Sequence, residues 1–198
     1  RTKKVQQNPL TLRGGFLLGI RQLKPCKIRL VNTRTNKALF PVLRRLSDGR
    51  FHSGQALAHE FGLSRASIYN MLSQSESMGL TVHAVRGRGY RLPDPVEWLD
   101  GDVVARHLGT LAPAYAIRVC DSVESTNTAL MAAALSGAAD GSLLCAEHQQ
   151  SGKGRRGRHW HSALGGSLTF SLLWRFENGL QSLAGLSLAV GLAIARAV

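Results

Sequence analysis

One short segment gathers cationic side chains and glycines around a tryptophan, AEHQQSGKGRRGRHWHS at residues 146–162. Its cations are Lys153, Arg155, Arg156 and Arg158. They lie too close together to pair with acidic residues nearby in the sequence, so their natural complement is an anion. Glycines let successive backbone N–H groups turn toward one anion, and arginine makes bidentate contacts to phosphate or carboxylate oxygens. Trp160 offers a flat apolar face that can stack on a purine or cover a bound ligand.

Glycine spacing in this segment matches a dinucleotide-binding pattern, G-x-G-x-x-G, at Gly152, Gly154 and Gly157. That pattern must open a helix whose N-terminus meets the pyrophosphate, whereas here the chain leads through a glycine pair into a strand-like run. A P-loop is also excluded, because Lys153 is followed by glycine instead of serine or threonine. Arginine and glycine together also occur in RNA- and DNA-binding loops. The strand-like runs on both sides instead predict a loop seated on a rigid sheet, where a site is expected.

A second polar group stands at the start of a predicted helix, in the stretch AIRVCDSVESTNTALMAAALSG. Ser125 or Thr126 is the expected N-cap, and Gly137 is expected to end the helix. The expected buried stripe consists of Leu130, Met131 and Ala134. Together with Asn127, the two capping residues place three hydrogen-bonding side chains beside unsatisfied N–H groups that can hold a polar ligand group. Ser and Thr caps are also common without any binding role.

The amino-terminal half predicts three helices and a hairpin between Ala38 and Leu92. Ser53 and Ser64 are the expected N-caps of the second and third helices, and Gly62 is expected to end the second. The third helix has the composition of a recognition helix, which fits the DNA major groove. Its predicted DNA contacts are Arg65, Ser67, Tyr69 and Asn70.

A basic turn, RGRG, joins the two short strand-like runs TVHAV and YRL. Arg86 and Arg88 stand at this turn and are expected to touch the phosphate backbone as the wing of a winged helix-turn-helix. Winged helices also serve as protein-interaction modules, and that alternative stays open. The two prolines of PDP at 93–95 predict a linker, so the expected division is a winged helix at 38–92, a linker at 93–97 and a second domain at 98–198.

Charge is distributed unevenly along the 198 residues, whose formal net charge is +13. Residues 1–37 carry ten basic and no acidic side chains, which suits either a nucleic-acid-binding arm or a solvated tail. The three cysteines, Cys26, Cys120 and Cys145, form no CxxC pair, so neither a disulfide framework nor a metal site is predicted. No apolar run reaches the roughly 18 residues of a membrane span. These features favour a cytoplasmic protein without a membrane partner.

The motifs together resemble the biotin protein ligases, in particular the bifunctional type that is also the biotin operon repressor. The resemblance is carried by ESTN (124–127), AEHQQSGKGRRGRHW (146–160), GLSL (185–188) and FHSGQALAHEFGLSRASIYNML (51–72), and it covers residues 38–198. It implies an α+β fold, in which a winged helix precedes a mixed α/β catalytic domain like that of class II aminoacyl-tRNA synthetases. It also implies biotin and ATP, with Mg²⁺ accompanying ATP, as ligands.

The activity that the resemblance implies has two steps. Biotin is joined to the α-phosphate of ATP as biotinyl-5′-AMP with loss of pyrophosphate, and the biotinyl group then passes to a lysine of biotin carboxyl carrier protein. With adenylate bound, the protein would form a homodimer on operator DNA and repress the biotin genes. A ligand-sensing repressor without ligase activity is the alternative.

Family positions can be carried over residue by residue. The positions expected to bind biotin or the adenylate are Ser125, Thr126, Asn127, Gln149, Lys153, Gly154, Arg155 and Trp160. The loop around Lys153 should close over the adenylate and exclude water, while Trp160 should stack on adenine. The roles of Arg156 and Arg158 stay open between phosphate binding and keeping the loop solvated.

The chain also departs from the family pattern. Lys153 replaces the more usual arginine, which keeps the charge but loses the bidentate fork. HSALGG stands where the family often has Ser-Pro. The KWPND strand with the catalytic lysine, and a small barrel, are expected beyond Val198. The catalytic domain is therefore expected to be truncated, and this chain alone is not expected to be a competent ligase.

Overall fold

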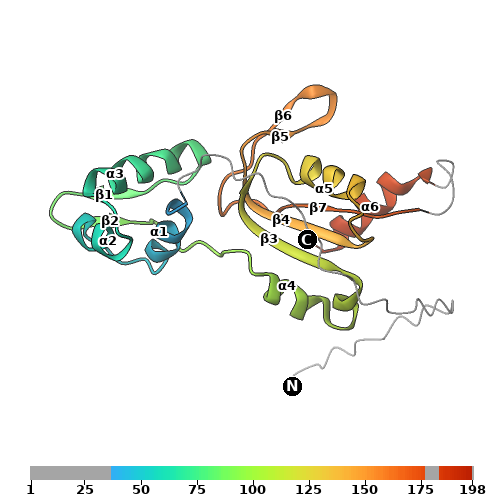
Figure 1. The fold of residues 1–198 in the computed structure, drawn as a ribbon, viewed down its shortest axis with the longest axis horizontal. Helices are drawn as coiled ribbons and strands as arrows, with labels where there is room; N and C mark the ends of the chain where they lie inside the picture. The colour runs from blue at the N-terminus through green and yellow to red at the C-terminus, as the bar shows by residue number, and fades with distance from the viewer. Residues whose placement is uncertain (1–36, 177–182, 198) are drawn as a thin grey trace, which may run out of the picture.

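The computed structural model describes residues 37–176 and 183–197, and Figure 1 shows two groups of elements joined by an extended segment. The amino-terminal group holds three helices, a 3₁₀ turn and a hairpin. Their bounds are α1 Leu39–Leu46, α2 Gly54–Glu60, α3 Arg65–Gln74, η1 Ser75–Met78, β1 His83–Val85 and β2 Gly89–Arg91. The tail at 1–36, with Cys26, lies outside the described residues.

Local sequence signals explain the bounds of α2 and α3. The predicted N-caps are confirmed, because the Ser53 hydroxyl accepts from the Ala56 N–H and the Ser64 hydroxyl accepts from the Ser67 N–H. Gly62 follows α2 with the left-handed φ of +63° that the prediction required. Apolar side chains from all three helices form one core, which consists chiefly of Leu39, Val42, Leu43, Leu46, Leu57, Ile68, Met71 and Leu72. The antiparallel β1–β2 hairpin completes the predicted winged helix.

The carboxy-terminal group is a mixed sheet with helices around it. Its elements are α4 Gly101–Leu108, η2 Gly109–Ala114, β3 Ala116–Val123, α5 Thr126–Leu135, β4 Ser142–Gln149, β5 Gly152–Lys153, η3 Arg155–Gly157, β6 His159–Trp160, β7 Thr169–Leu172 and α6 Leu186–Ala197. The main sheet has the order β3-β4-β7, with β3 and β4 parallel and β7 antiparallel to β4. Helices and a mixed sheet after a winged helix confirm the α+β class.

Helix α5 connects the parallel strands β3 and β4 and packs on the sheet through Leu130 and Ala133, which meet Leu144 of β4. The prediction that Met131 belongs to this buried stripe is wrong, because its side chain is 63% exposed. Thr126, Leu130 and Ala133 face inward at helical spacings of four and three, which turns Met131 to the flank and leaves Ala134 only half-buried. The cap at Ser125 is confirmed.

The described residues contain two free cysteines, no helix that could span a membrane and no cluster of metal-binding side chains. Cys120 and Cys145 are free thiols on neighbouring strands, and burial raises the pKa of Cys120 to about 11. Within 37–176 and 183–197, no helix has the length and apolar character to cross a bilayer, and no three His, Cys, Asp or Glu residues gather as metal ligands would.

Candidate functional site

The start of α5 is held by a side chain from the next strand. Oε1 of Gln149 accepts from the Thr126 backbone N–H at 2.8 Å and from the Thr126 hydroxyl at 3.1 Å. The same hydroxyl lies 2.8 Å from the Ser171 hydroxyl on β7. Ser125 and Thr126 are each only 2% exposed. One helix N–H that would otherwise need water is therefore satisfied by Gln149, and side chains from α5, β4 and β7 meet around one polar point.

The cationic segment begins directly beside this point. The Gln150 N–H donates to the Val123 carbonyl at 2.9 Å, and the Ser151 N–H donates to the Glu124 carbonyl at 2.8 Å. These bonds tie the residues after β4 to the residues before α5. The base of the cationic segment is consequently fixed next to the helix start.

Gly152 is required by close packing at this base. A Cβ there would lie 2.4 Å from the carbonyl oxygen of Trp160 and 3.1 Å from Nε2 of Gln149. Because Gly152 pairs with Trp160 and Lys153 pairs with His159, the segment forms the hairpin β5–β6. The sequence predicted a flexible loop at this place, and the structure instead shows two short paired strands closed by the 3₁₀ turn η3.

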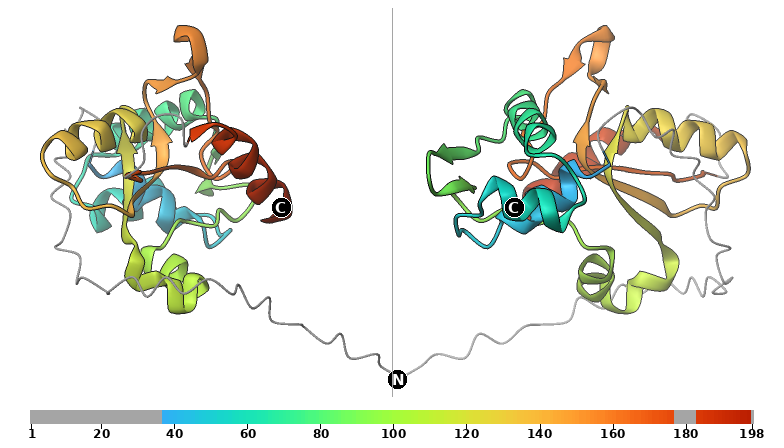
Figure 2. Two further views of the ribbon diagram at one scale, coloured as in Figure 1. Left: turned by 90° about the vertical axis from the view of Figure 1, so that its right-hand side faces the viewer. Right: turned by 60° about the vertical axis from the view of Figure 1, so that its left-hand side comes forward.

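The tip of this hairpin presents cations around a concave surface. That surface is lined by Gly154, Arg155, Arg156, Arg158, His159 and Trp160. The Gly154 N–H donates to the Arg158 carbonyl at 2.7 Å, and Arg156 adopts a left-handed φ of 58°. Trp160 is 59% exposed. Figure 2 shows the hairpin extending away from the sheet.

The predicted ligand residues therefore fall into two places. Ser125, Thr126 and Gln149 lie together at the buried end of the sheet, with Asn127 exposed on the first turn of α5. The remaining ones, Lys153, Gly154, Arg155 and Trp160, lie on the projecting hairpin. Sequence reasoning missed Ser171, whose only signal is a polar position in the apolar run of β7.

Four of the six predicted DNA contacts line one concave surface of the winged helix. A concave surface between α2, α3 and the wing is lined by Ser53, Gln55, Arg65, Tyr69, Arg86 and Arg88, among others. Asn70 is exposed on α3. Ser67 is half-buried, and its hydroxyl lies 2.8 Å from the Ser64 hydroxyl, so it contributes to the cap of α3. Gln55, on the first turn of α2, also lines this surface and was not among the predicted contacts.

Polar contacts join the two groups of elements. Arg44 of α1 pairs with Asp121 of β3 at 2.5 Å, and its guanidinium also lies 4.8 Å from the ring centroid of Trp98. The Trp98 indole N–H donates to the Ser47 hydroxyl at 2.8 Å. The Leu99 N–H donates to the buried carboxylate of Glu147 at 2.6 Å. These contacts anchor the segment after the predicted linker to both groups.

An apolar contact makes a second junction. Leu164, in the segment that follows β6, is 3% exposed and belongs to the core of the winged helix. Its N–H donates to the Met78 carbonyl at 3.0 Å. The cationic hairpin is thus four residues away from a side chain buried in the core of the winged helix.

Comparison with known proteins identifies the class of each group. Residues 39–91 match a helix-turn-helix domain. Residues 119–198 match the model of the biotin/lipoate A/B protein ligase family. The amino-terminal group is therefore similar to a helix-turn-helix domain, and the carboxy-terminal group is similar to the biotin/lipoate A/B protein ligase family.

The chain is also similar to curated proteins that are named as bifunctional ligase/repressors or as a biotin ligase. The chain is 39% identical to the bifunctional ligase/repressor BirA of Salmonella typhimurium over 152 residues, which is 76% of this chain and 45% of that protein. It is 35% identical to the protein of the same name from Escherichia coli, over 82% of this chain and 49% of that protein. A biotin–[acetyl-CoA-carboxylase] ligase of Mycobacterium tuberculosis is 44% identical over 72 residues, which is 35% of this chain and 27% of that protein. The chain spans about half the length of the two BirA relatives.

Proposed function

We propose that this chain is part of an ATP-dependent biotin ligase that also represses transcription. The carboxylate of biotin would attack the α-phosphate of ATP, with Mg²⁺ accompanying the nucleotide, and pyrophosphate would leave. A lysine of biotin carboxyl carrier protein would then attack the acyl carbon of biotinyl-5′-AMP and release AMP. The observation that carries this proposal is the buried Thr126–Gln149 contact directly beside the Gly–Arg hairpin.

The geometry supports different roles for the helix start, which would bind biotin, and for the hairpin, which would bind the adenylate. Oε1 of Gln149 is engaged by Thr126, so its Nε2 remains to donate to the ureido ring of biotin. Lys153, Gly154 and Arg155 would contact the adenylate phosphate, and Trp160 would stack on adenine. Folding of the hairpin over the anhydride would exclude water until the acceptor lysine arrives.

The repressor part of the proposal concerns the winged helix at 38–92, which a linker at 93–97 separates from the ligase domain. Arg65, Ser67, Tyr69 and Asn70 would read operator DNA, and Arg86 and Arg88 would contact phosphates. We also propose that adenylate binding favours a homodimer on a two-fold operator, and that the protein acts in the cytoplasm.

Two experiments test the proposal. In a preparation that spans the full length of the relatives, labelled pyrophosphate should exchange into ATP only when biotin is present. Absence of exchange together with retained DNA binding would favour a ligand-sensing repressor without ligase activity.

In the present chain, a non-hydrolysable biotinyl-AMP analogue should bind and change the fluorescence of Trp160. Arg155→Ala should weaken that binding by about 1.5–3 kcal/mol, the value of a lost hydrogen bond to a charged group. An unchanged affinity of Arg155→Ala would remove this residue from the site.

A further inference from the structure

Two arginines of the wing share one aromatic ring. The guanidinium carbon of Arg88 lies 4.2 Å from the ring centroid of Phe51, and that of Arg91 lies 5.2 Å from the same centroid. Cations within about 6 Å of a ring are attracted by the negative face of its π-system. Phe51 therefore holds two long side chains that would otherwise sample many rotamers.

Neither arginine has an acidic partner in the described part of the chain. The ion pairs there involve Arg44, Arg45 and His52 as the basic members. Nε of Arg91 is buried without a hydrogen-bond partner. Two like charges gathered at one ring, with no carboxylate to neutralise them, form a place where an anion is favoured.

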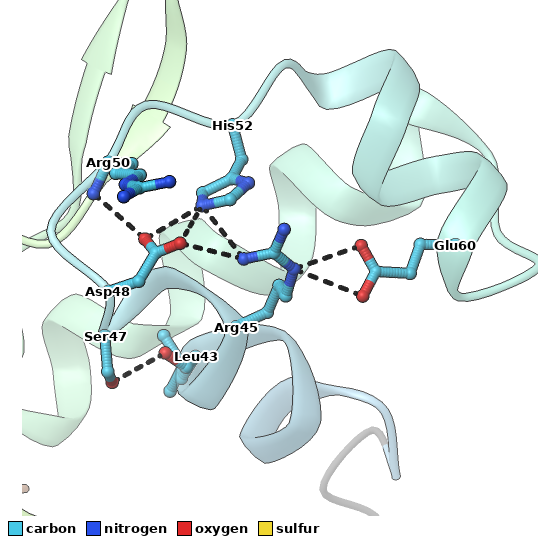
Figure 3. A network of polar contacts seen from close by, with 7 residues as sticks. All are labelled: Leu43, Arg45, Ser47, Asp48, Arg50, His52 and Glu60. Carbon is cyan, nitrogen blue, oxygen red and sulfur yellow. Dashed lines mark hydrogen bonds and ion pairs between the residues drawn. The ribbon is translucent and has the colours of Figure 1, made fainter.

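The position of the ring is fixed by its neighbours. The His52 N–H donates to the Tyr90 carbonyl at 2.9 Å, and the Tyr90 N–H donates to the His52 carbonyl at 2.8 Å, so the residue after Phe51 pairs with the wing. In Figure 3 the His52 ring is bound in turn by Asp48, with Nε2 2.9 Å from Oδ1. A Cβ at Gly89 would lie 2.1 Å from the His52 carbonyl oxygen, so only glycine permits this approach.

We propose that Arg91 is a phosphate contact of the wing beside Arg88, and that Phe51 is the positioning residue that holds both guanidinium groups for the DNA backbone. Arg88 lines the same concave surface as Arg65 and Tyr69 of α3, so it stands next to the proposed recognition helix, and Arg91 shares the Phe51 ring with it. Holding the side chains in place before binding reduces the entropy lost when a phosphate is engaged. The inference rests on the proposed binding of DNA by the winged helix.

The test uses the whole chain and a fluorescent 30-base-pair duplex of random sequence, with anisotropy measured over a series of KCl concentrations. Each phosphate contact contributes about −0.9 to the slope of log K against log salt, so Arg91→Met and Arg88→Met should each make the slope less steep by about that amount. Phe51→Leu keeps both charges, so it should weaken binding roughly fivefold with an unchanged slope. Phe51→Tyr should restore the affinity.

Arg106→Met is the matched control, because Arg106 is an exposed arginine on α4, and it should leave both affinity and slope unchanged. Binding of the unchanged chain to the duplex tests the proposed function separately, before any variant is compared. An unaltered slope in Arg91→Met would overturn the contact. Full affinity in a folded Phe51→Leu, or failure of Phe51→Tyr to restore it, would overturn the positioning role.

Discussion

Two substitutions of Gln149 can separate the structural role of its side-chain oxygen from the proposed ligand-binding role of its side-chain nitrogen. The oxygen accepts hydrogen bonds from Thr126, whereas the nitrogen is proposed to donate to the ligand. In Gln149→Met the Thr126 N–H and hydroxyl lose their acceptor at 2.8 and 3.1 Å. An unsatisfied buried donor costs about 1–3 kcal/mol, and the Thr126 hydroxyl keeps Ser171 as a partner. We therefore expect a loss of about 1–3 kcal/mol in the free energy of unfolding.

Gln149→Glu should behave differently. Its carboxylate still accepts from Thr126 and stands at the positive end of α5, so stability should stay within about 0.5 kcal/mol of the unchanged chain. Neither the glutamate nor the methionine side chain has an N–H donor, so binding of the biotinyl-AMP analogue should be lost in both variants.

The assay for this pair of variants is urea unfolding followed by circular dichroism, combined with titration of the analogue. Gln150→Met is the control, since Gln150 is an exposed neighbour whose amide bonds the Ser122 hydroxyl at 3.2 Å. Unchanged stability of Gln149→Met would refute the role of the oxygen, and unchanged analogue affinity of Gln149→Glu would refute the role of the nitrogen.

Three further predictions concern the hairpin, the junction and pH. Gly152→Ala should open the β5–β6 hairpin, because the added Cβ would lie 2.4 Å from the carbonyl oxygen of Trp160. Amide hydrogen exchange at residues 152–160 should then become faster, and unchanged exchange would contradict the packing argument. A double-mutant cycle of Arg44→Ala and Asp121→Ala should give a coupling of only about 0.2–1 kcal/mol in urea unfolding, since both side chains are over a third exposed; zero coupling would mean that the pair does not anchor the junction. The pKa of Asp48 is lowered from 3.8 to about 2, chiefly by its hydrogen bond with His52, so its stabilising effect is complete above its ordinary pKa and lost as pH falls toward 2. Asp48→Asn should thus lower Tm at pH 7, with a difference that closes between about pH 4 and pH 2, whereas a difference that persists at pH 2 would contradict this assignment.

Features that depend on neighbours in sequence could be predicted. The caps at Ser53, Ser64 and Ser125 follow from side chains that bond their own helix, and Gly62 follows from the left-handed conformation that ends α2. The winged helix follows from the capped helices α2 and α3, the apolar spacing of α1 and a glycine-rich turn.

Features that depend on residues far apart in the sequence could not be predicted. The Arg44–Asp121 pair joins residues 77 positions apart, and the burial of Leu164 in the winged-helix core requires knowing how the two groups pack. Met131 was assigned to the buried stripe because apolar type alone does not set the rotation of a short, mostly apolar helix. The pairing of β5 with β6 was missed because a segment rich in glycine and arginine carries almost no strand propensity.

The most direct test of the central claim compares amide hydrogen exchange at residues 152–160 with and without the biotinyl-AMP analogue. If the cationic hairpin closes over the adenylate, its amides should become strongly protected when the analogue is bound, while those of α3 change little. Equal exchange in the two samples, at a concentration where the analogue is bound, would contradict the account.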